Sequence, residues 1–133
     1  MTCYCRKLRR LTAAVKKRYD QILAPALVTA SQYGLLLNIS HLGTATTREL
    51  ATLAELERST LARNLRPLLS QGLIADDRPS GARDHRLTLT DKGQKTLALA
   101  KRLWNQAQEE LTERLGPEGL AALETLAKAW TDD

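Results

Sequence analysis

Residues 47–71, TRELATLAELERSTLARNLRPLLSQ, decide the fold of this 133-residue chain. Thr46 followed by Glu49 is a capping box, which predicts a short helix over about 47–54. Its expected core face is Leu50, Ala51 and Leu53. A short polar turn then leads into a second predicted helix over about 58–71, whose buried face consists of leucines three and four residues apart: Leu61, Leu65, Leu68 and Leu69. Pro67 lies inside this helix and is expected to kink it. The two segments together predict a helix-turn-helix.

A β-hairpin is expected directly after this helix pair. Residues 73–75 form a short apolar run, and residues 86–89 alternate between polar and apolar side chains, as strands do. Between them, Pro79 and Gly81 supply the residues that a turn requires. A helix-turn-helix followed by a hairpin is a winged helix, so the fold class is mainly α with a small β-hairpin.

Longer helices are predicted on both sides of this unit. Before it lie an apolar stripe over about 4–24, ended by Pro25, and a helix over about 32–41 that Thr29 or Ser31 caps. After it, Thr90 caps a helix with a nearly heptad seam, Gly116-Pro117 breaks that helix, and a last helix ends near Trp130. We expect one domain over 1–133, with dimerisation helices at about 4–24 and 91–131 and the winged helix-turn-helix at about 31–90. Trp104 and Trp130 are expected in the dimer core, with a ligand pocket as the alternative.

The charge is unevenly distributed and points to a polyanionic partner. Residues 1–90 hold 14 Lys and Arg against 7 Asp and Glu, whereas residues 91–133 hold 6 against 8. Arginine binds phosphates and guanine in two places at once, and a helix of this size fits the major groove of double-stranded DNA. The candidate contacts on the second helix lie between its leucines: Arg58, Ser59, Thr60, Arg63 and Arg66. The alternative is a solvated polar face.

The predicted hairpin carries a second group of arginines. Arg78, Arg83 and Arg86 surround the sequence Pro79-Ser80-Gly81. A thin basic hairpin can enter the minor groove, whose negative potential attracts arginine. The alternative is a charged loop that only interacts with water, and the nearby aspartates either favour that alternative or hold the arginines in place.

Cys3 and Cys5 are the other informative residues. Both lie beside Arg6, Lys7, Arg9 and Arg10 at the start of the first helix, where cationic neighbours favour the reactive thiolate. Three interpretations stay open: inert thiols, an oxidant- or ligand-sensing pair, or a partial site for a soft metal ion. A disulfide between two residues of one helical turn requires that turn to unwind, whereas a bridge between subunits does not.

Other function classes are not favoured. The sequence has no Gly-rich phosphate loop, no Ser-His-Asp arrangement and no carboxylate pair in an apolar setting, so we expect no enzyme, no cofactor and no metal. No apolar run approaches 18 residues and no secretory signal is recognised, so we expect a cytoplasmic protein without a membrane partner. The alternatives to a DNA-binding regulator are a thiol- or metal-handling protein using Cys3 and Cys5, or a winged-helix module that binds proteins.

Five short segments together resemble the multiple-antibiotic-resistance regulator (MarR) family of bacterial winged-helix repressors. They are QYGLL at 32–36, TRELA at 47–51, RSTLARNL at 58–65, LSQGLI at 69–74 and LTDKG at 89–93. The resemblance rests on their order and spacing, and extends over about residues 8–130.

This resemblance implies a homodimer in which the first helix and the last two helices form a shared body. It also implies a regulator that a small molecule or an oxidant releases from its operator. The family's wing arginine corresponds to Arg83, six residues before Leu89. The aspartate that the family has two residues before this arginine is Gly81 here, so Arg86 is expected to share the role of Arg83.

Overall fold

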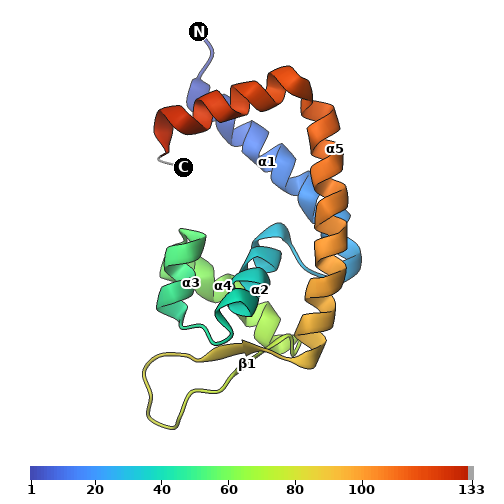
Figure 1. Cartoon of the computed structure of the whole chain (residues 1–133). Helices are drawn as coiled ribbons and strands as arrows, with labels where there is room; N and C mark the ends of the chain where they lie inside the picture. The colour runs from blue at the N-terminus through green and yellow to red at the C-terminus, as the bar shows by residue number, and fades with distance from the viewer. Residues whose placement is uncertain (132–133) are drawn as a thin grey trace.

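The computed structural model describes residues 1–131 and confirms a mainly helical chain with one small hairpin (Figure 1). In chain order the elements are α1 (Tyr4–Leu23), the 3-10 turn η1 (Ala24–Ala26), α2 (Ala30–Leu42), α3 (Thr47–Ala54), α4 (Arg58–Ser70), β1 (Ile74–Asp76), β2 (Leu87–Leu89) and α5 (Asp91–Trp130). Each strand is three residues long, and both begin one residue later than the predicted runs 73–75 and 86–89.

Threonines start three of the five α-helices, because a threonine hydroxyl accepts a hydrogen bond from a backbone N–H that the helix leaves unpaired. Of the two predicted caps for α2, Thr29 is the one used, and it forms a capping box with Gln32. Thr46 and Glu49 form the predicted capping box of α3. The Thr90 hydroxyl accepts from the Gly93 N–H at 3.0 Å and begins α5.

The wing, which comprises β1, β2 and the connecting residues 77–86, is joined to the helix-turn-helix at its base. The two strands pair antiparallel, with Ile74 opposite Leu89 and Asp76 opposite Leu87. On the other edge of β2, Leu87 exchanges two backbone hydrogen bonds, of 2.8 and 2.9 Å, with Ala45, which lies in the loop before α3. These bonds fix the base of the wing relative to α3.

The core of the winged-helix unit, which is α2–α4 with the two strands, also includes the end of α1 and consists mainly of leucine. The largest fully buried side chains are Leu23, Leu35, Leu36, Ile39, Leu50, Leu61, Leu68, Leu73 and Leu87. The prediction that Leu53 and Leu69 belong to this core is wrong. Leu53 is 55% exposed and Leu69 is 39% exposed, because each lies on the side of its helix that faces away from the core. α4 continues past Pro67 to Ser70, as the leucine pattern predicted.

α1 and α5 pack against each other and connect to the winged-helix unit through an aromatic stack. Trp104 of α5 lies between Tyr19 of α1 and Tyr33 of α2, with ring centroids 4.5 and 4.9 Å away. Arg18 binds Glu110 through two hydrogen bonds of 2.5 Å between α1 and α5. The Trp104 ring thus packs between two rings of its own chain, and its expected place in a dimer core stays a prediction.

The predicted break at Gly116 is confirmed. Gly116 has φ 67° and ψ 175°, far from helical values, and Pro117 follows it. The chain therefore turns after Gly116, and the last part of α5 lies at the end of the molecule opposite the wing (Figure 1).

Large apolar side chains are exposed at this end of the molecule. Those of α1 and of the last part of α5 are Tyr4, Leu8, Leu11, Leu115, Leu123, Leu126 and Trp130. The first half of the predicted stripe on α1 therefore contacts little of its own chain. Within residues 1–131, no single helix has the length and apolarity needed to cross a membrane, and only Tyr4–Ala26 combined with Ala30–Leu42, bent by 64°, passes that test of length and composition.

A close backbone approach fixes where α5 leaves the wing. A Cβ atom on Gly93 would lie 1.9 Å from the Leu73 carbonyl oxygen, which also accepts a hydrogen bond from the Thr90 N–H at 3.1 Å. Only glycine allows this contact.

We predict that Gly93→Ala lowers the free energy of unfolding by about 1–3 kcal/mol, because the added methyl group forces α5 away from Leu73. Gly34→Ala is the matched control, since nothing lies within 4 Å of a Cβ atom at that helical position. It is expected to leave stability unchanged or raise it by up to about 1 kcal/mol. Urea denaturation measures both, and equal midpoints for the two variants would contradict the prediction.

Candidate nucleic-acid interface

The outer face of α4 presents most of the residues predicted to contact DNA. Arg58, Ser59, Arg63 and Arg66 are exposed, whereas Leu61, Leu65 and Leu68 are buried. This division follows from the three- and four-residue spacing of the leucines, which turns the intervening positions outward. Thr60 is partly buried, and its hydroxyl accepts a hydrogen bond from Arg63 Nη2 at 3.4 Å.

The first turn of α4 differs from the first turns of α2, α3 and α5. Its N-cap residue is Glu57, whose side chain makes no capping hydrogen bond. The first backbone N–H groups of α4 therefore have no side-chain acceptor at Glu57, and together with the helix dipole they favour a negative group.

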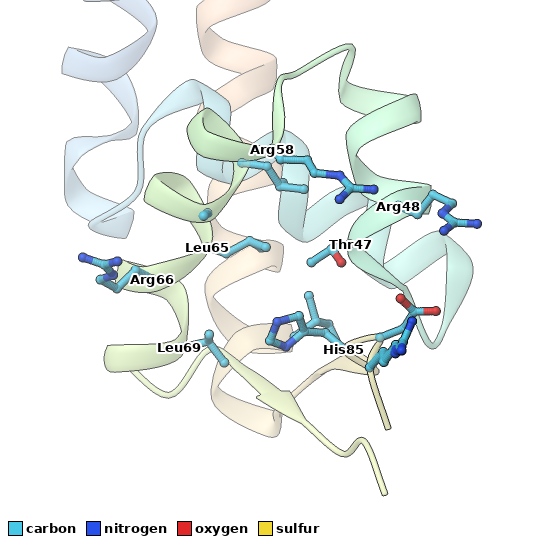
Figure 2. Close-up of a pocket in the computed structure, with 12 residues that line it drawn as sticks. Thr47, Arg48, Arg58, Leu65, Arg66, Leu69 and His85 are labelled. Carbon is cyan, nitrogen blue, oxygen red and sulfur yellow. The ribbon is translucent and has the colours of Figure 1, made fainter. Parts of the chain in front are cut away.

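A groove of about 610 Å³ lies between α3, α4 and the wing (Figure 2). Its apolar lining includes Leu65 and Leu87. Its polar lining includes four arginines, which are Arg48 from α3, Arg58 and Arg66 from α4, and Arg83 from the wing, together with Thr47, Asp84 and His85. In Figure 2, Arg58 extends toward α3, whereas Arg66 extends to the other side of α4. The groove thus has cations along its edges and can accept an anionic chain.

The wing turns at Gly81. Gly81 has φ 83°, and the Ala82 N–H donates to the Pro79 carbonyl at 3.0 Å, so Gly81 occupies the turn position that favours glycine. Arg83 and Arg86 are both exposed. Arg83 reaches the groove beside α4, whereas Arg86 lies next to β2 at the base of the wing.

Asp76 connects both ends of the loop between the strands. Its Oδ1 accepts the backbone N–H groups of Arg78 and Arg86, each at 3.2 Å, and its Oδ2 lies 2.5 Å from His85 Nδ1. The Arg78 guanidinium lies 3.4 Å from the same Oδ2. Asp76 therefore anchors this wing, although the aspartate that the family resemblance placed two residues before Arg83 is absent.

These contacts keep Asp76 ionised. Partial burial raises its pKa, but the hydrogen bonds from His85 and from the Arg86 and Arg78 backbone outweigh burial, and the net pKa lies below its ordinary value. A carboxyl group with a lowered pKa stabilises the folded state above the unfolded value of about 3.9, and this contribution is lost as the pH falls through the folded value. The Asp76 anchor is therefore complete near neutral pH.

Comparison with known proteins identifies the chain. A family model described as the MarR family matches residues 28–86. A search of curated proteins gives no match. The crystal structure of the M. tuberculosis transcriptional regulator MosR in complex with DNA is 34% identical over 96% of each chain, with a TM-score of 0.79. The chain belongs to the MarR family.

Two other solved structures support this assignment. The transcriptional repressor CouR bound to p-coumaroyl-CoA is 30% identical, with a TM-score of 0.82, over 96% of this chain and 92% of CouR. A mutant of MarR from E. coli complexed with operator DNA is 26% identical, with a TM-score of 0.79, over 93% of this chain and 90% of that one. MarR-family proteins are transcription regulators rather than enzymes, so this chain is a DNA-binding transcriptional regulator.

The predicted DNA-contacting residues of this MarR-family chain fall into two groups. Arg58, Arg66 and Arg83 line the groove, whereas Ser59, Thr60, Arg63 and Arg86 lie on α4 or the wing outside its lining. The sequence interpretation omitted Arg48. This residue lies two positions after the capping-box Thr46 and is exposed, a signal that charge and helix position together contained. Asp76 was considered only among the aspartates near the hairpin, which either favour a solvated loop or hold the arginines in place. The structure shows that its carboxylate contacts Arg78 and His85, and these contacts depend on the hairpin register.

The two predicted sensing cysteines lie at the opposite end of the molecule from the wing. Both are exposed. Cys3 is the N-cap of α1 with extended dihedral angles, and only Cys5 lies within the helix, where Arg9 Nη2 approaches its Sγ at 3.8 Å. The helix thus begins at the predicted residue 4, and the two thiols do not lie within one helical turn. Among residues 1–131, no group of three or more His, Cys, Asp or Glu residues has an arrangement that could hold a metal ion.

Proposed function

We propose that this regulator is a homodimeric repressor that binds a pseudo-palindromic operator and is released by a small ligand or by oxidation of its thiols. The observation that carries the proposal is the cationic surface that α4 and the wing form together. The structures of MosR and of the MarR mutant with DNA support it, as does the printed description of CouR as a repressor.

In this proposal α4 lies in the major groove. Its 13 residues extend about 20 Å, and its exposed face offers arginines and small hydroxyl groups to bases and phosphates. The proposed contacts are Arg58, Ser59, Thr60, Arg63 and Arg66. Arg83 and Arg86 of the wing enter the adjacent minor groove, where the negative potential favours arginine.

A second copy of the chain is the proposed cover of the exposed apolar side chains. The dimerisation helices are about 4–24 and 91–131, and the winged helix-turn-helix is about 31–90. Trp130 is 88% exposed and Tyr4 is 75% exposed. A two-fold interface between two copies would remove both side chains from water. Such a dimer sets two copies of α4 about 34–36 Å apart, which is one turn of DNA.

Cys3 and Cys5 are the proposed oxidant sensors. Cys3 lies in a shallow depression beside Arg6, Lys7 and Arg10, where its exposed thiol is open to an oxidant. Peroxide converts a thiolate to a sulfenic acid, which condenses with a second thiol to form a disulfide and water. Because α1 belongs to the proposed dimer body, this bridge changes how the two winged-helix units are held.

For DNA contacts, we expect Arg63→Ala and Arg83→Ala each to weaken binding to a duplex selected from a random pool by about 1–3 kcal/mol. The loss comes from the removal of a charged contact to a base or phosphate. Fluorescence anisotropy measures the affinity. Arg102→Ala on the exposed side of α5 is the matched control and is expected to bind as the wild type does. Unchanged affinity in both folded variants would refute the assignment.

For assembly, we expect sedimentation equilibrium at micromolar concentration to give twice the chain mass of 14.8 kDa. Leu123→Asp shifts the protein toward the monomer, because it places a charge in the proposed interface. Leu53→Asp on α3 is the control, since Leu53 and Leu123 are 55% and 54% exposed. A wild-type monomer that binds a palindromic duplex tightly would contradict the dimer.

For switching, peroxide is expected to lower the operator affinity of the wild type and to leave that of a Cys3→Ser/Cys5→Ser variant unchanged. The physical reason is that the variant has no thiol left to oxidise. The same titration in reductant shows that the variant binds DNA normally. If oxidant changes both proteins equally, a small ligand becomes the better candidate for the release signal.

A further inference from the structure

His85 has a contact pattern that the DNA-contact arginines lack. Its Nδ1 lies 2.5 Å from Asp76 Oδ2, and its side chain is 37% exposed. Figure 2 shows the imidazole ring between α4 and the base of the wing, inside the groove. A carboxylate therefore binds Nδ1 of the ring, while the rest of the imidazole stays open to the groove.

The hydrogen bond to Asp76 decides what the other ring nitrogen can do. Because an ionised carboxylate only accepts, Nδ1 carries the hydrogen of this bond. In the neutral ring Nε2 is then an acceptor, which repels the oxygens of a phosphate. In the imidazolium Nε2 is a donor and carries positive charge, so only the protonated ring binds a phosphate.

The surroundings make this protonation depend on the ligand. The charged groups that share the groove are Arg48 of α3, Arg58 and Arg66 of α4, and Arg83 and Asp84 of the wing, while Asp76, Arg78 and Arg86 lie at the base of the wing. The Asp76 carboxylate contacts the ring, whereas the other nearby charges are mostly arginines. A phosphate bound in the groove adds negative charge on the open side of the ring and therefore favours the imidazolium.

We propose that His85, oriented by Asp76, binds a phosphate of the DNA backbone as an imidazolium, so that DNA binding takes up a proton at each wing. This rests on the proposed placement of α4 and the wing against DNA. Asp76 is a positioning residue here, because it fixes which nitrogen of His85 faces the groove. His85 acts on affinity without reading sequence, since phosphate contacts carry no base information.

The test is the affinity for a mixed-sequence duplex at low salt between about pH 6 and about pH 8, the range in which histidine changes charge. We expect the wild type to bind more tightly as the pH falls, by up to about tenfold per pH unit for each proton taken up. His85→Gln is expected to bind as the wild type does at about pH 8 and to show no gain at lower pH. Circular dichroism confirms that each variant is folded.

Two further variants separate the charge of His85 from a structural role. His85→Arg is expected to bind tightly across the whole pH range, because its charge is permanent. His41→Gln is the matched control, since His41 is the only other histidine and is exposed at the end of α2. It is expected to keep the wild-type pH dependence. Asp76→Asn is expected to reduce the gain at low pH.

The salt dependence provides an independent readout. The affinity falls as salt rises, and each lost phosphate contact makes the slope of log K against log salt less steep by about 0.9. We expect wild type and His85→Gln to differ by this amount per protomer at about pH 6, and to agree at about pH 8. A structural defect would change the slope equally at both pH values.

The outcomes distinguish this inference from the function on which it rests. If His85→Gln keeps the pH dependence of the wild type, or if the wild type shows none, the role of His85 is overturned while the proposed DNA contacts stand. If the wild type binds no duplex at any pH, both proposals are overturned.

Discussion

The stack of Trp104 between Tyr19 and Tyr33 is the contact on which the arrangement of the whole chain depends. It joins three elements distant in sequence: α1, α2 and α5. The chain has five aromatic residues in all, two Trp and three Tyr, and this one contact uses three of them. Each stacked pair contributes about 0.5–1.5 kcal/mol beyond the burial of its area. Burial also raises the pKa of both tyrosines, so their hydroxyl groups stay neutral, and that of Tyr19 donates to Gln108.

The wing is tied to the same framework by backbone contacts. The Leu73 carbonyl accepts a hydrogen bond from the Thr90 N–H and occupies the space that a side chain on Gly93 would need. On the other strand, the backbone of Leu87 pairs with that of Ala45. The base of the wing is therefore held by α5 and by the loop before α3 together. A change in the angle of α5 has a direct physical path to the wing, because no flexible linker lies between them. This continuity is what the proposed thiol switch requires.

The tip of the wing depends on electrostatics rather than packing. Residues 77–84 are all exposed, so the loop gains little from apolar burial. One carboxylate, that of Asp76, pairs with the backbone at both ends of the loop and with His85. This arrangement holds Arg83 beside the groove without using the position that Gly81 occupies. Because Asp76 anchors the loop, position 81 needs no aspartate. Glycine suits this position, since the turn requires a φ of 83°, which other residues adopt only with strain.

The amino-acid sequence by itself determined the helices, their caps and the break at Gly116. These features follow from local rules: leucine spacing, a hydroxyl three residues before a backbone donor, and a Gly-Pro pair. The exposed arginines of α4 follow from the same leucine spacing. Tertiary structure alone decided that Trp104 stacks between two rings of its own chain and that Leu53 and Leu69 face outward. It also decided that Asp76 faces His85, because a hairpin register brings together residues nine positions apart that no helical or strand period connects.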